Sequence, residues 1–155
     1  MTSQVLAKLS ALNIELPEPA PPAANYVPWK KSGIHIFISG QLPMINGELK
    51  YQGKIGRDMD EDAGIEAARL CALNILAQLQ VACDGNLDRV VSCVRLGGFV
   101  NCVDDFSAQP KVINGASQLM IDVFGEQGMH ARAAVGTNSL PLGVAVEVDA
   151  IFEIK

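Results

Sequence analysis

Residues 60–83 decide the fold class, and they read DEDAGIEAARLCALNILAQLQVAC. The stretch has no proline and is rich in alanine and leucine. Its apolar residues recur every three or four positions, which is the period of one helix face; they include Ala63, Ala67, Leu70, Leu73 and Leu76. We therefore expect one long helix that ends near Gly85, because glycine favours the backbone conformation that terminates helices.

The residues before this helix have the pattern of β-strands. Between Ile34 and Ser39, isoleucine alternates with other side chains, and a period of two residues indicates a strand. The pair Asn46-Gly47, just before residues 48–51, is a strong signal for a two-residue hairpin turn. Together with the segment that starts at Asn25, three strands are expected before the helix.

The residues after this helix predict a strand followed by a second helix. The strand spans residues 89–103, and Gly97-Gly98 within it indicates a bulge or a close approach of another backbone. The helical region begins at Asp105, is irregular around Pro110 and is regular from residue 116 to residue 124.

Two further strands, residues 131–138 and 144–154, are joined by Leu140-Pro141-Leu142-Gly143 and are expected to form a terminal hairpin. The order β-β-β-α-β-α-β-β predicts a two-layer α+β domain, in which two helices cover one face of a mixed six-stranded sheet. The other face of the sheet mixes small and polar residues, and we expect it to meet further copies of the chain.

The N-terminal residues predict a separate small segment. Thr2 or Ser3 can cap a short helix with leucines on one stripe, and residues 17–22 read PEPAPP, which suits an extended connector. We therefore divide the chain into residues 1–22, an N-terminal helix and connector, and residues 23–155, the domain proper.

Composition argues against several classes of partner. The 155 residues carry a net charge of −5, and the only adjacent basic pair is Lys30-Lys31, whereas nucleic-acid binders need a basic surface. No apolar run approaches the length of a membrane span, and residues 1–16 lack the pattern of a signal peptide. We expect a cytoplasmic protein with no nucleic acid or membrane as partner.

The four cysteines do not predict a metal site. None of the pairs has CxxC spacing, and no paired histidines lie near them, although zinc sites need closely spaced ligands. All four lie in apolar stretches, where reduced cysteine behaves as a small core residue; they are Cys71, Cys83, Cys93 and Cys102. We expect reduced thiols and no bound metal.

Arg132 is the strongest candidate for a functional residue. It lies in residues 131–136, which read ARAAVG, so small neighbours leave space around the guanidinium. Arginine binds carboxylates through two parallel hydrogen bonds, and a ligand acid could lie against this strand. The alternative is an ion pair with Glu147 or Asp149 on an adjacent strand. The register of the two strands decides whether Arg132 and Glu147 share a face.

Several short motifs, taken in chain order, carry a family resemblance. They are Tyr26, Ser39-Gly40-Gln41-Leu42-Pro43, Asn114, Ala131-Arg132, Leu140-Pro141 and Val146-Glu147. With them the chain resembles the RidA/YjgF family from about residue 23 to residue 154, and within it the longer branch labelled YjgF-like putative endoribonuclease, chorismate-mutase-like.

The resemblance implies a chorismate-mutase-like fold assembled as a homotrimer, with one site in each of three clefts between subunits. It also implies hydrolytic deamination of small enamines and imines, such as 2-aminoacrylate and 2-iminobutanoate, to 2-oxo acids. No cofactor is implied. The partner of such a site is a small carboxylate substrate.

The same resemblance assigns roles residue by residue. Arg132 matches the arginine that clamps the substrate carboxylate, and Glu147 matches the acid that positions a water. The expected substrate contacts are Tyr26, Ser39, Gly40, Phe106, Asn114, Arg132 and Ala134. Two features depart from the pattern, namely Ala134, where deaminating members often have cysteine, and an insertion between Phe106 and Asn114.

Simpler interpretations of these residues remain open. Tyr26 can be a half-buried edge aromatic, Ser39 can cap a turn, Gly40 can mark a bend, and Asn114-Gly115 can be a turn or a helix N-cap. The alternative function is a non-catalytic trimer that binds and senses small carboxylate metabolites. RNA cleavage and chorismate rearrangement are disfavoured by the acidic charge and by the lack of further cationic clamps.

Overall fold

The structure is a computed structural model that describes residues 2–21 and 24–155. Its helices are α1 (Gln4–Ala11), α2 (Glu61–Ala82) and α3 (Gln109–Phe124), and its strands are β1 (Trp29–Ser32), β2 (His35–Gln41), β3 (Met44–Ile45), β4 (Glu48–Leu49), β5 (Val90–Asn101), β6 (Ala131–Thr137) and β7 (Val146–Ile154). The boundary expected between residues 22 and 23 lies outside the described residues.

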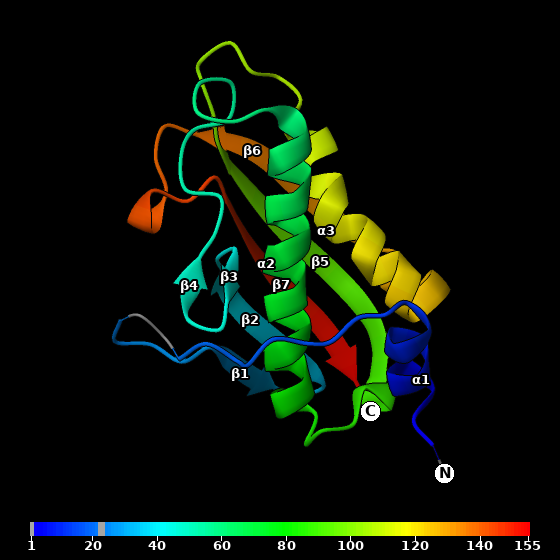
Figure 1. Cartoon of the computed structure of the whole chain (residues 1–155). Coiled ribbons are helices and arrows are strands. Elements are labelled where there is room, and N and C mark those ends of the chain that lie inside the picture. Colours follow the sequence, from blue (N-terminus) through cyan, green and yellow to red (C-terminus); the bar gives the residue numbers. More distant parts are fainter. Residues whose placement is uncertain (1, 22–23) are drawn as a thin grey trace.

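The architecture is the expected α+β arrangement of two layers. Five strands form a mixed sheet in the order β1-β2-β7-β5-β6, and α2 and α3 cover one of its faces (Figure 1). The sheet has five strands and not six, because β3 and β4 pair only with each other. Their turn is the predicted Asn46-Gly47, with positive φ angles of 51° and 83°, as a two-residue hairpin of this kind requires.

The expected terminal hairpin of β6 and β7 is wrong. β5 lies between these two strands, parallel to β6 and antiparallel to β7. The physical reason is that β5, α3 and β6 form a β-α-β unit, whose crossover places the two strands side by side and parallel. β7 therefore pairs with the other side of β5.

Helix α2 confirms the helix predicted over residues 60–83. The side chain of Asp60 accepts a hydrogen bond from the backbone N–H of Ala63 at 2.9 Å and caps the first turn. Glu61 and Asp62 follow in that turn, where negative charge is favourable near the helix N-terminus. After the helix, Gly85 has a φ of 83° and accommodates the change of direction.

Helix α3 starts four residues after Asp105, where the helical region was expected to begin, and is regular before residue 116. It begins at Gln109, and Pro110 is tolerated because it lies in the first turn, where its missing N–H costs no hydrogen bond. Asn114 is therefore in the helix, neither in a turn nor at an N-cap. A Cβ atom on Gly115 would collide with the carbonyl oxygen of Ile65 in α2, so this glycine permits close packing of the two helices.

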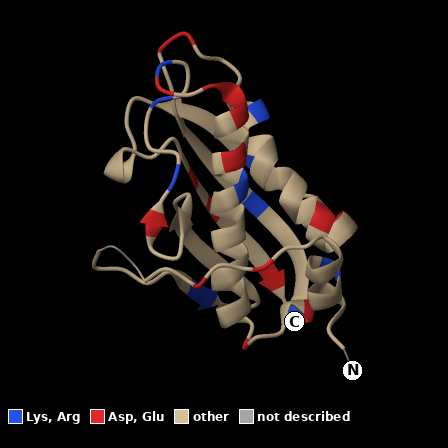
Figure 2. Cartoon of the chain, viewed as in Figure 1, with Lys and Arg blue, Asp and Glu red and all other residues tan. Residues whose placement is uncertain are grey.

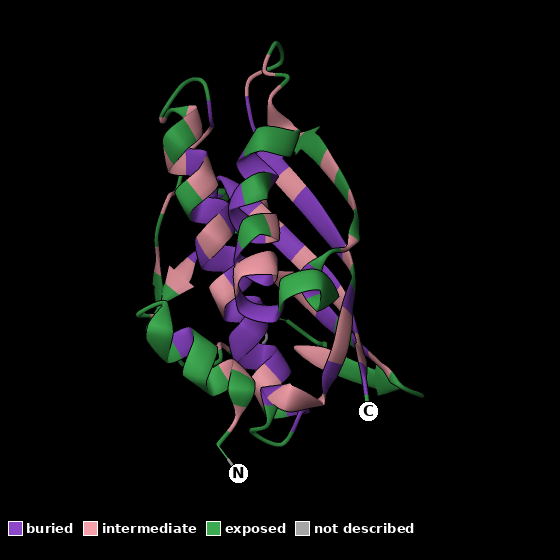
Figure 3. Ribbon diagram, turned by 90° about the vertical axis from the view of Figure 1, so that its right-hand side faces the viewer, coloured by how far each residue is buried: buried purple, intermediate pink, exposed green. Residues whose placement is uncertain are grey.

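The core lies between the helices and the sheet (Figure 3). Along β7 the even-numbered residues are buried and the odd-numbered residues are half-buried. Phe152 and the other even-numbered residues therefore face the helices. Glu147, Asp149 and Ile151 face the open side of the sheet. At Gly97 and Gly98 side chains approach closely, where a bulge or another backbone was predicted: a Cβ on Gly97 would collide with the side chain of Asp149, and one on Gly98 with the side chain of Ile113 of α3.

Helix α1 is held against the rest of the chain by Asp88. The carboxylate of Asp88 accepts hydrogen bonds of 2.9 Å from the hydroxyl of Ser3 and the backbone N–H groups of Gln4 and Val5. The bond from Val5, with the others, lowers the pKa of Asp88. Leu9 is only 4% exposed and belongs to the main core.

Lys54 joins three loops at the end of the sheet that carries the C-terminus of β6. Its ammonium donates to the side-chain oxygen of Asn101 at 2.7 Å and to the carbonyl oxygens of Cys102 at 3.2 Å and Asn138 at 2.8 Å. Asn101, which is buried, in turn donates from its amide to the carbonyl of Val144 at 3.2 Å. These bonds tie the segment before α2 to the ends of β5 and β6.

Charged side chains are distributed over helices, strands and loops (Figure 2). Among the described residues, no helix combines the length and the apolar character that are needed to cross a bilayer.

Candidate functional site

Arg132 lies on the side of the sheet that faces the helices. It is paired with Leu96 of β5 in the parallel register, and Leu96 is fully buried beneath the helices. The guanidinium contacts α3, where Nη1 donates to Oδ1 of Asn114 at 2.8 Å and to Oγ of Ser117 at 3.0 Å. Its Nη2 donates to the carbonyl oxygen of Pro110 at 3.0 Å.

The alternative ion pair of Arg132 with Glu147 or Asp149 is not formed. Both acids face the open side of the sheet, and Asp149 lies 3.6 Å from Nη1 of Arg95. All three hydrogen bonds of Arg132 go to neutral oxygens. Nε–H and one Nη2–H have no acceptor within the described part of the chain. Arg132 is half-buried, keeps its full charge and has two N–H groups for an incoming acid.

Small residues lie next to this guanidinium, and a cavity lies further along, at the C-terminal end of β6. Ala134 and Gly136 alternate with Arg132 on the same face of β6. Beyond them is a cavity of about 320 Å³ with Phe106, Gln109 and Gly136 in its wall. The amide of Gln109 donates to the carbonyl of Phe106 at 2.9 Å. The residue after Gln109 is Pro110, whose carbonyl accepts the hydrogen bond from Nη2 of Arg132. The structure thus brings Arg132, Asn114, Ala134 and Phe106 to one region.

Glu147 belongs to a different region, on the open side of the sheet. The register of β2 against β7 shifts between Ile38 and Gln41, so that Ser39 and Gly40 form a bulge. A Cβ atom on Gly40 would collide with the carboxylate of Glu147. Only glycine at this position lets the carboxylate lie against the strand, so Gly40 is more than a bend before Pro43.

The environment of Glu147 makes its carboxyl group a weaker acid than usual. Partial burial raises its pKa, and the negative charge of Asp149 raises it further. Burial also raises the pKa of Asp149, against the opposing effect of Arg95. A carboxyl group with a raised pKa holds a proton closer to neutral pH and can both give and accept one.

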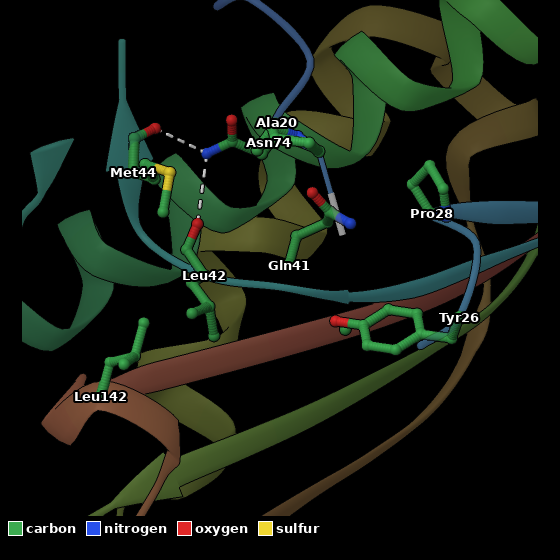
Figure 4. Close-up of a pocket in the computed structure, with 10 residues that line it drawn as sticks. Ala20, Tyr26, Pro28, Gln41, Leu42, Met44, Asn74 and Leu142 are labelled. Carbon is green, nitrogen blue, oxygen red and sulfur yellow. Dashed lines mark hydrogen bonds between the residues drawn. The ribbon is translucent and has the colours of Figure 1, made fainter. Parts of the chain in front are cut away.

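Tyr26 and Ser39 lie on the same side as Gly40. The hydroxyl of Ser39 donates to the carbonyl of Val27 at 2.7 Å, and the backbone N–H of Ser39 donates to the carbonyl of Pro28 at 3.0 Å. Ser39 therefore holds the segment that carries Tyr26. The phenol of Tyr26 points into a cavity that also has Gly40 and Asn74 in its wall (Figure 4).

The predicted site residues therefore form two groups within one chain. Arg132, Asn114, Ala134 and Phe106 lie at β6 and the first turns of α3, while Glu147, Gly40, Ser39 and Tyr26 lie around the bulge of β2. Sequence reasoning missed Ser117 and His130, which adjoin Arg132. The available signals were their spacings: Ser117 follows Asn114 by three residues on a helix, and His130 precedes Arg132 by two residues, just before β6 begins.

Comparison with known proteins identifies the class. A model of the family described as "YjgF/chorismate mutase-like, putative endoribonuclease" matches residues 6–153, so the chain belongs to this family, as its motifs predicted. The protein TCP17 of Trypanosoma cruzi is 46% identical over 155 residues, which are 99% of this chain and 96% of TCP17.

Two crystal structures show the same fold. The protein Atu1372 of unknown function from Agrobacterium tumefaciens is 47% identical, with a TM-score of 0.90 over 97% of this chain and 94% of that one. A "putative endoribonuclease" from Shewanella oneidensis is 37% identical, with a TM-score of 0.94 over 99% of this chain and 100% of that one.

Proposed function

We propose that this protein hydrolyses small reactive enamines and imines of the 2-aminoacrylate and 2-iminobutanoate type to 2-oxo acids, in clefts between copies of the chain. The observation that carries the proposal is the state of Arg132. Its guanidinium is oriented by three neutral oxygens, next to small residues, and retains two N–H groups for a carboxylate.

The cleft has to be formed by two copies, because the two groups of residues lie on opposite faces of one sheet. Arg132 faces the helices with Leu96, and Glu147 faces the open side opposite Phe99. A substrate of a few atoms cannot touch both in one chain. Two copies packed side by side can bring the Arg132 of one to the Glu147 of the next.

The open face supports association of this kind. Phe37 is 45% exposed and Val135 47% exposed, and Phe99 and Ile151 lie beside them in the register. An apolar sheet face of this kind is typical of a surface covered by another chain. We propose a homotrimer, as the family resemblance implies, and a cytoplasmic location, which the four buried and unpaired cysteines support.

The proposed reaction needs positioning more than it needs strong catalytic groups. Protonation of the enamine carbon gives the iminium ion, water adds to the C=N carbon and loses a proton, and cleavage of the C–N bond in the resulting carbinolamine then releases ammonia and leaves the 2-oxo acid. Arg132 holds the substrate carboxylate, which fixes the position of the imine carbon. Glu147 orients the water, and its raised pKa suits the transfer of protons to and from nitrogen.

Ala134 limits what β6 adds to this chemistry. A methyl group takes no part in proton transfer, so the thiol that deaminating relatives often have at this position is not used. The backbone carbonyl of residue 134 remains as an acceptor for a water. The proposal therefore assigns proton transfer to Glu147 alone.

Complementation between two inactive variants tests the proposal. Arg132→Ala and Glu147→Gln are each expected to lose turnover of enzymatically generated 2-iminobutanoate. If each site takes Arg132 from one copy and Glu147 from another, unfolding both variants together and refolding the equal mixture restores about one quarter of the sites, because random assembly gives each intact half with a probability of about one half.

The outcomes separate the candidate functions. Recovery of activity in the mixture supports the shared cleft, and an inactive mixture of correctly assembled protein contradicts it. If the wild-type protein binds 2-oxo acids in a thermal-shift assay but hydrolyses no imine, it is a binder of small carboxylates and the hydrolytic proposal is wrong.

A further inference from the structure

A chain of hydrogen bonds leads from Arg132 back to the turn before its strand. Nη1 of Arg132 donates to Oγ of Ser117 at 3.0 Å. Oγ of Ser117 lies 2.8 Å from Nε2 of His130, and Nδ1 of His130 lies 2.6 Å from the carbonyl oxygen of Gly128. Four groups from α3, β6 and the turn between them are thus linked in sequence.

With a neutral imidazole at His130, the chemistry of the two end groups fixes the direction of every bond in this chain. A guanidinium can only donate, and a carbonyl oxygen can only accept. Nδ1 of His130 must therefore carry a hydrogen, and in the neutral ring Nε2 then has a free lone pair. The hydroxyl of Ser117 donates to that lone pair and uses its own oxygen to accept from Arg132. A second hydrogen, on Nε2, would remove this acceptor and leave the hydroxyl hydrogen of Ser117 without a partner.

We propose that Ser117 and His130 are positioning residues for Arg132, which act by holding its guanidinium with two N–H groups free for the substrate carboxylate. Without Ser117, Nη1 would keep only the bond to Asn114, whose side chain is exposed on α3. Without neutral His130, the hydroxyl of Ser117 is free to rotate and can itself donate. This chain of hydrogen bonds therefore restricts the guanidinium to one orientation.

The backbone around Gly128 supports the far end of the chain. A Cβ atom on Gly128 would collide with the carbonyl oxygen of Met120 in α3. The turn at residues 125–128 can therefore pack directly onto the helix, and the carbonyl that orients the imidazole is fixed relative to Ser117. The arrangement depends on this one glycine as much as on the two polar side chains.

The first test is a tautomer measurement by two-bond ¹H–¹⁵N NMR correlation on the uniformly labelled full-length protein. The chain has only two histidines, His35 and His130, so assignment needs one variant, His35→Gln. The expected result near neutral pH is a protonated Nδ1 and an unprotonated Nε2 in His130. The Nε2–H tautomer would overturn the proposal.

The second test separates positioning from folding. The positioning role rests on the proposed carboxylate site, and the ligand used to probe that site is 2-oxobutanoate. Ser117→Ala is expected to raise its Kd and the KM of turnover about tenfold, the effect of one hydrogen bond to a charged group, with kcat changed less than about twofold. Gln118→Ala is the matched control, because the amide of Gln118 donates to Asp122 on the exposed side of α3.

A pair of variants at His130 completes the design. His130→Phe is expected to raise KM as Ser117→Ala does, and His130→Gln, which can still accept from Ser117, is expected to restore most of the loss. Equal thermal stability of both variants excludes a folding effect. If both give the wild-type KM, or if Gln118→Ala gives the same rise as Ser117→Ala, the proposal is wrong.

Failure of the proposed function gives a different signature. If the wild-type protein neither binds 2-oxobutanoate nor hydrolyses imines, the carboxylate site is refuted, and the positioning role is judged from Arg132 itself. The Nε–H signal of Arg132 is then expected to move in Ser117→Ala and His130→Phe but not in Gln118→Ala. An unchanged signal in all three would overturn the positioning role.

Discussion

The two halves of the candidate site are built on opposite principles. Around Arg132, a charged group is surrounded by neutral hydrogen-bond acceptors from α3, so its charge is oriented but not neutralised. Around Glu147, the carboxylate lies against Gly40 with another acid, Asp149, nearby, and its charge is disfavoured. In the proposed function, one half holds an anion and the other holds a proton.

This difference explains why neither half is a complete site. A clamp for a carboxylate cannot transfer protons, since arginine does not lose its proton in proteins. A protonatable acid on an open sheet face has nothing to orient a substrate. The sheet separates the two within one chain, and each half can be tested by its own variants.

Gly40→Ala is expected to have the largest effect, because the new Cβ occupies the position of the Glu147 carboxylate. Displacement of a catalytic group by about 1 Å can lower the rate about 100-fold, and we expect a loss of that size in kcat/KM. The double variant Gly40→Ala with Glu147→Asp should recover part of the rate, since the shorter acid leaves room. Full activity in Gly40→Ala would show that Glu147 is not needed where it lies.

Arg132→Lys tests whether orientation or charge matters in the other half. Lysine keeps the charge but loses the planar donor pair, so KM for the imine is expected to rise about tenfold, by analogy with the loss of one charged hydrogen bond. The control is Arg57→Lys, on an exposed loop where Arg57 pairs with Asp58. An unchanged KM in Arg132→Lys would mean that charge alone holds the substrate.

Gly115→Ala tests the helix packing that supports the Arg132 half. Collision with the carbonyl of Ile65 is expected to cost about 1–3 kcal/mol. Alanine is about 1 kcal/mol more favourable than glycine within a helix. We therefore expect the variant to be destabilised by roughly 1 kcal/mol in total. Urea unfolding would measure the difference, with Gln118→Ala as the control in the same helix. A more stable Gly115→Ala variant would show that the helices can move apart without cost.

Glu147→Gln should have the smallest effect on stability, and that effect should depend on pH. The pKa of Glu147 is raised in the folded state, so the folded protein binds a proton more tightly than the unfolded chain and loses stability as the pH rises through the raised pKa. Glu147→Gln has no carboxyl group at this position, so it does not lose stability in this way as the pH rises. It is expected to be more stable than the wild type at neutral pH and to lose that advantage in acid, below about pH 4.

Thermal unfolding from pH 4 to pH 8 would show the trend for Glu147→Gln. Glu153→Gln, on the same face of β7, is the comparison. A variant that gains no stability relative to the wild type as the pH rises would contradict the raised pKa.

Local signals in the sequence predicted the local structure well. The cap at Asp60, the absence of proline after it and the turn at Asn46-Gly47 each act over a few residues, and the structure confirms them. Strand order is different, because it depends on pairing between distant segments. The short link between β6 and β7 suggested a hairpin, but α3 had already brought β6 alongside β5.

The same distinction between local signals and long-range pairing applies to the candidate site. Its small neighbours made Arg132 a candidate for a ligand contact, with an ion pair as the alternative, and the family motifs indicated Arg132, Asn114, Gly40 and Glu147. The face that each side chain occupies could not be predicted, since a strand's face follows from its register with a distant partner. Ser117 and His130 were missed because Ser117 contacts Arg132 from another element and His130 is linked to Arg132 only through Ser117.

The triple contact of Lys54 has a practical consequence for chemical treatment of the protein. Its ammonium uses all three hydrogens to bridge the loops at one end of the sheet, close to the cavity beside Phe106. Reductive dimethylation, often applied to aid crystallisation, would leave a single hydrogen there, and acetylation would remove the charge as well. Lysine-modified samples are therefore expected to have loosened loops at the end of β6, and ligand binding should be measured on unmodified protein.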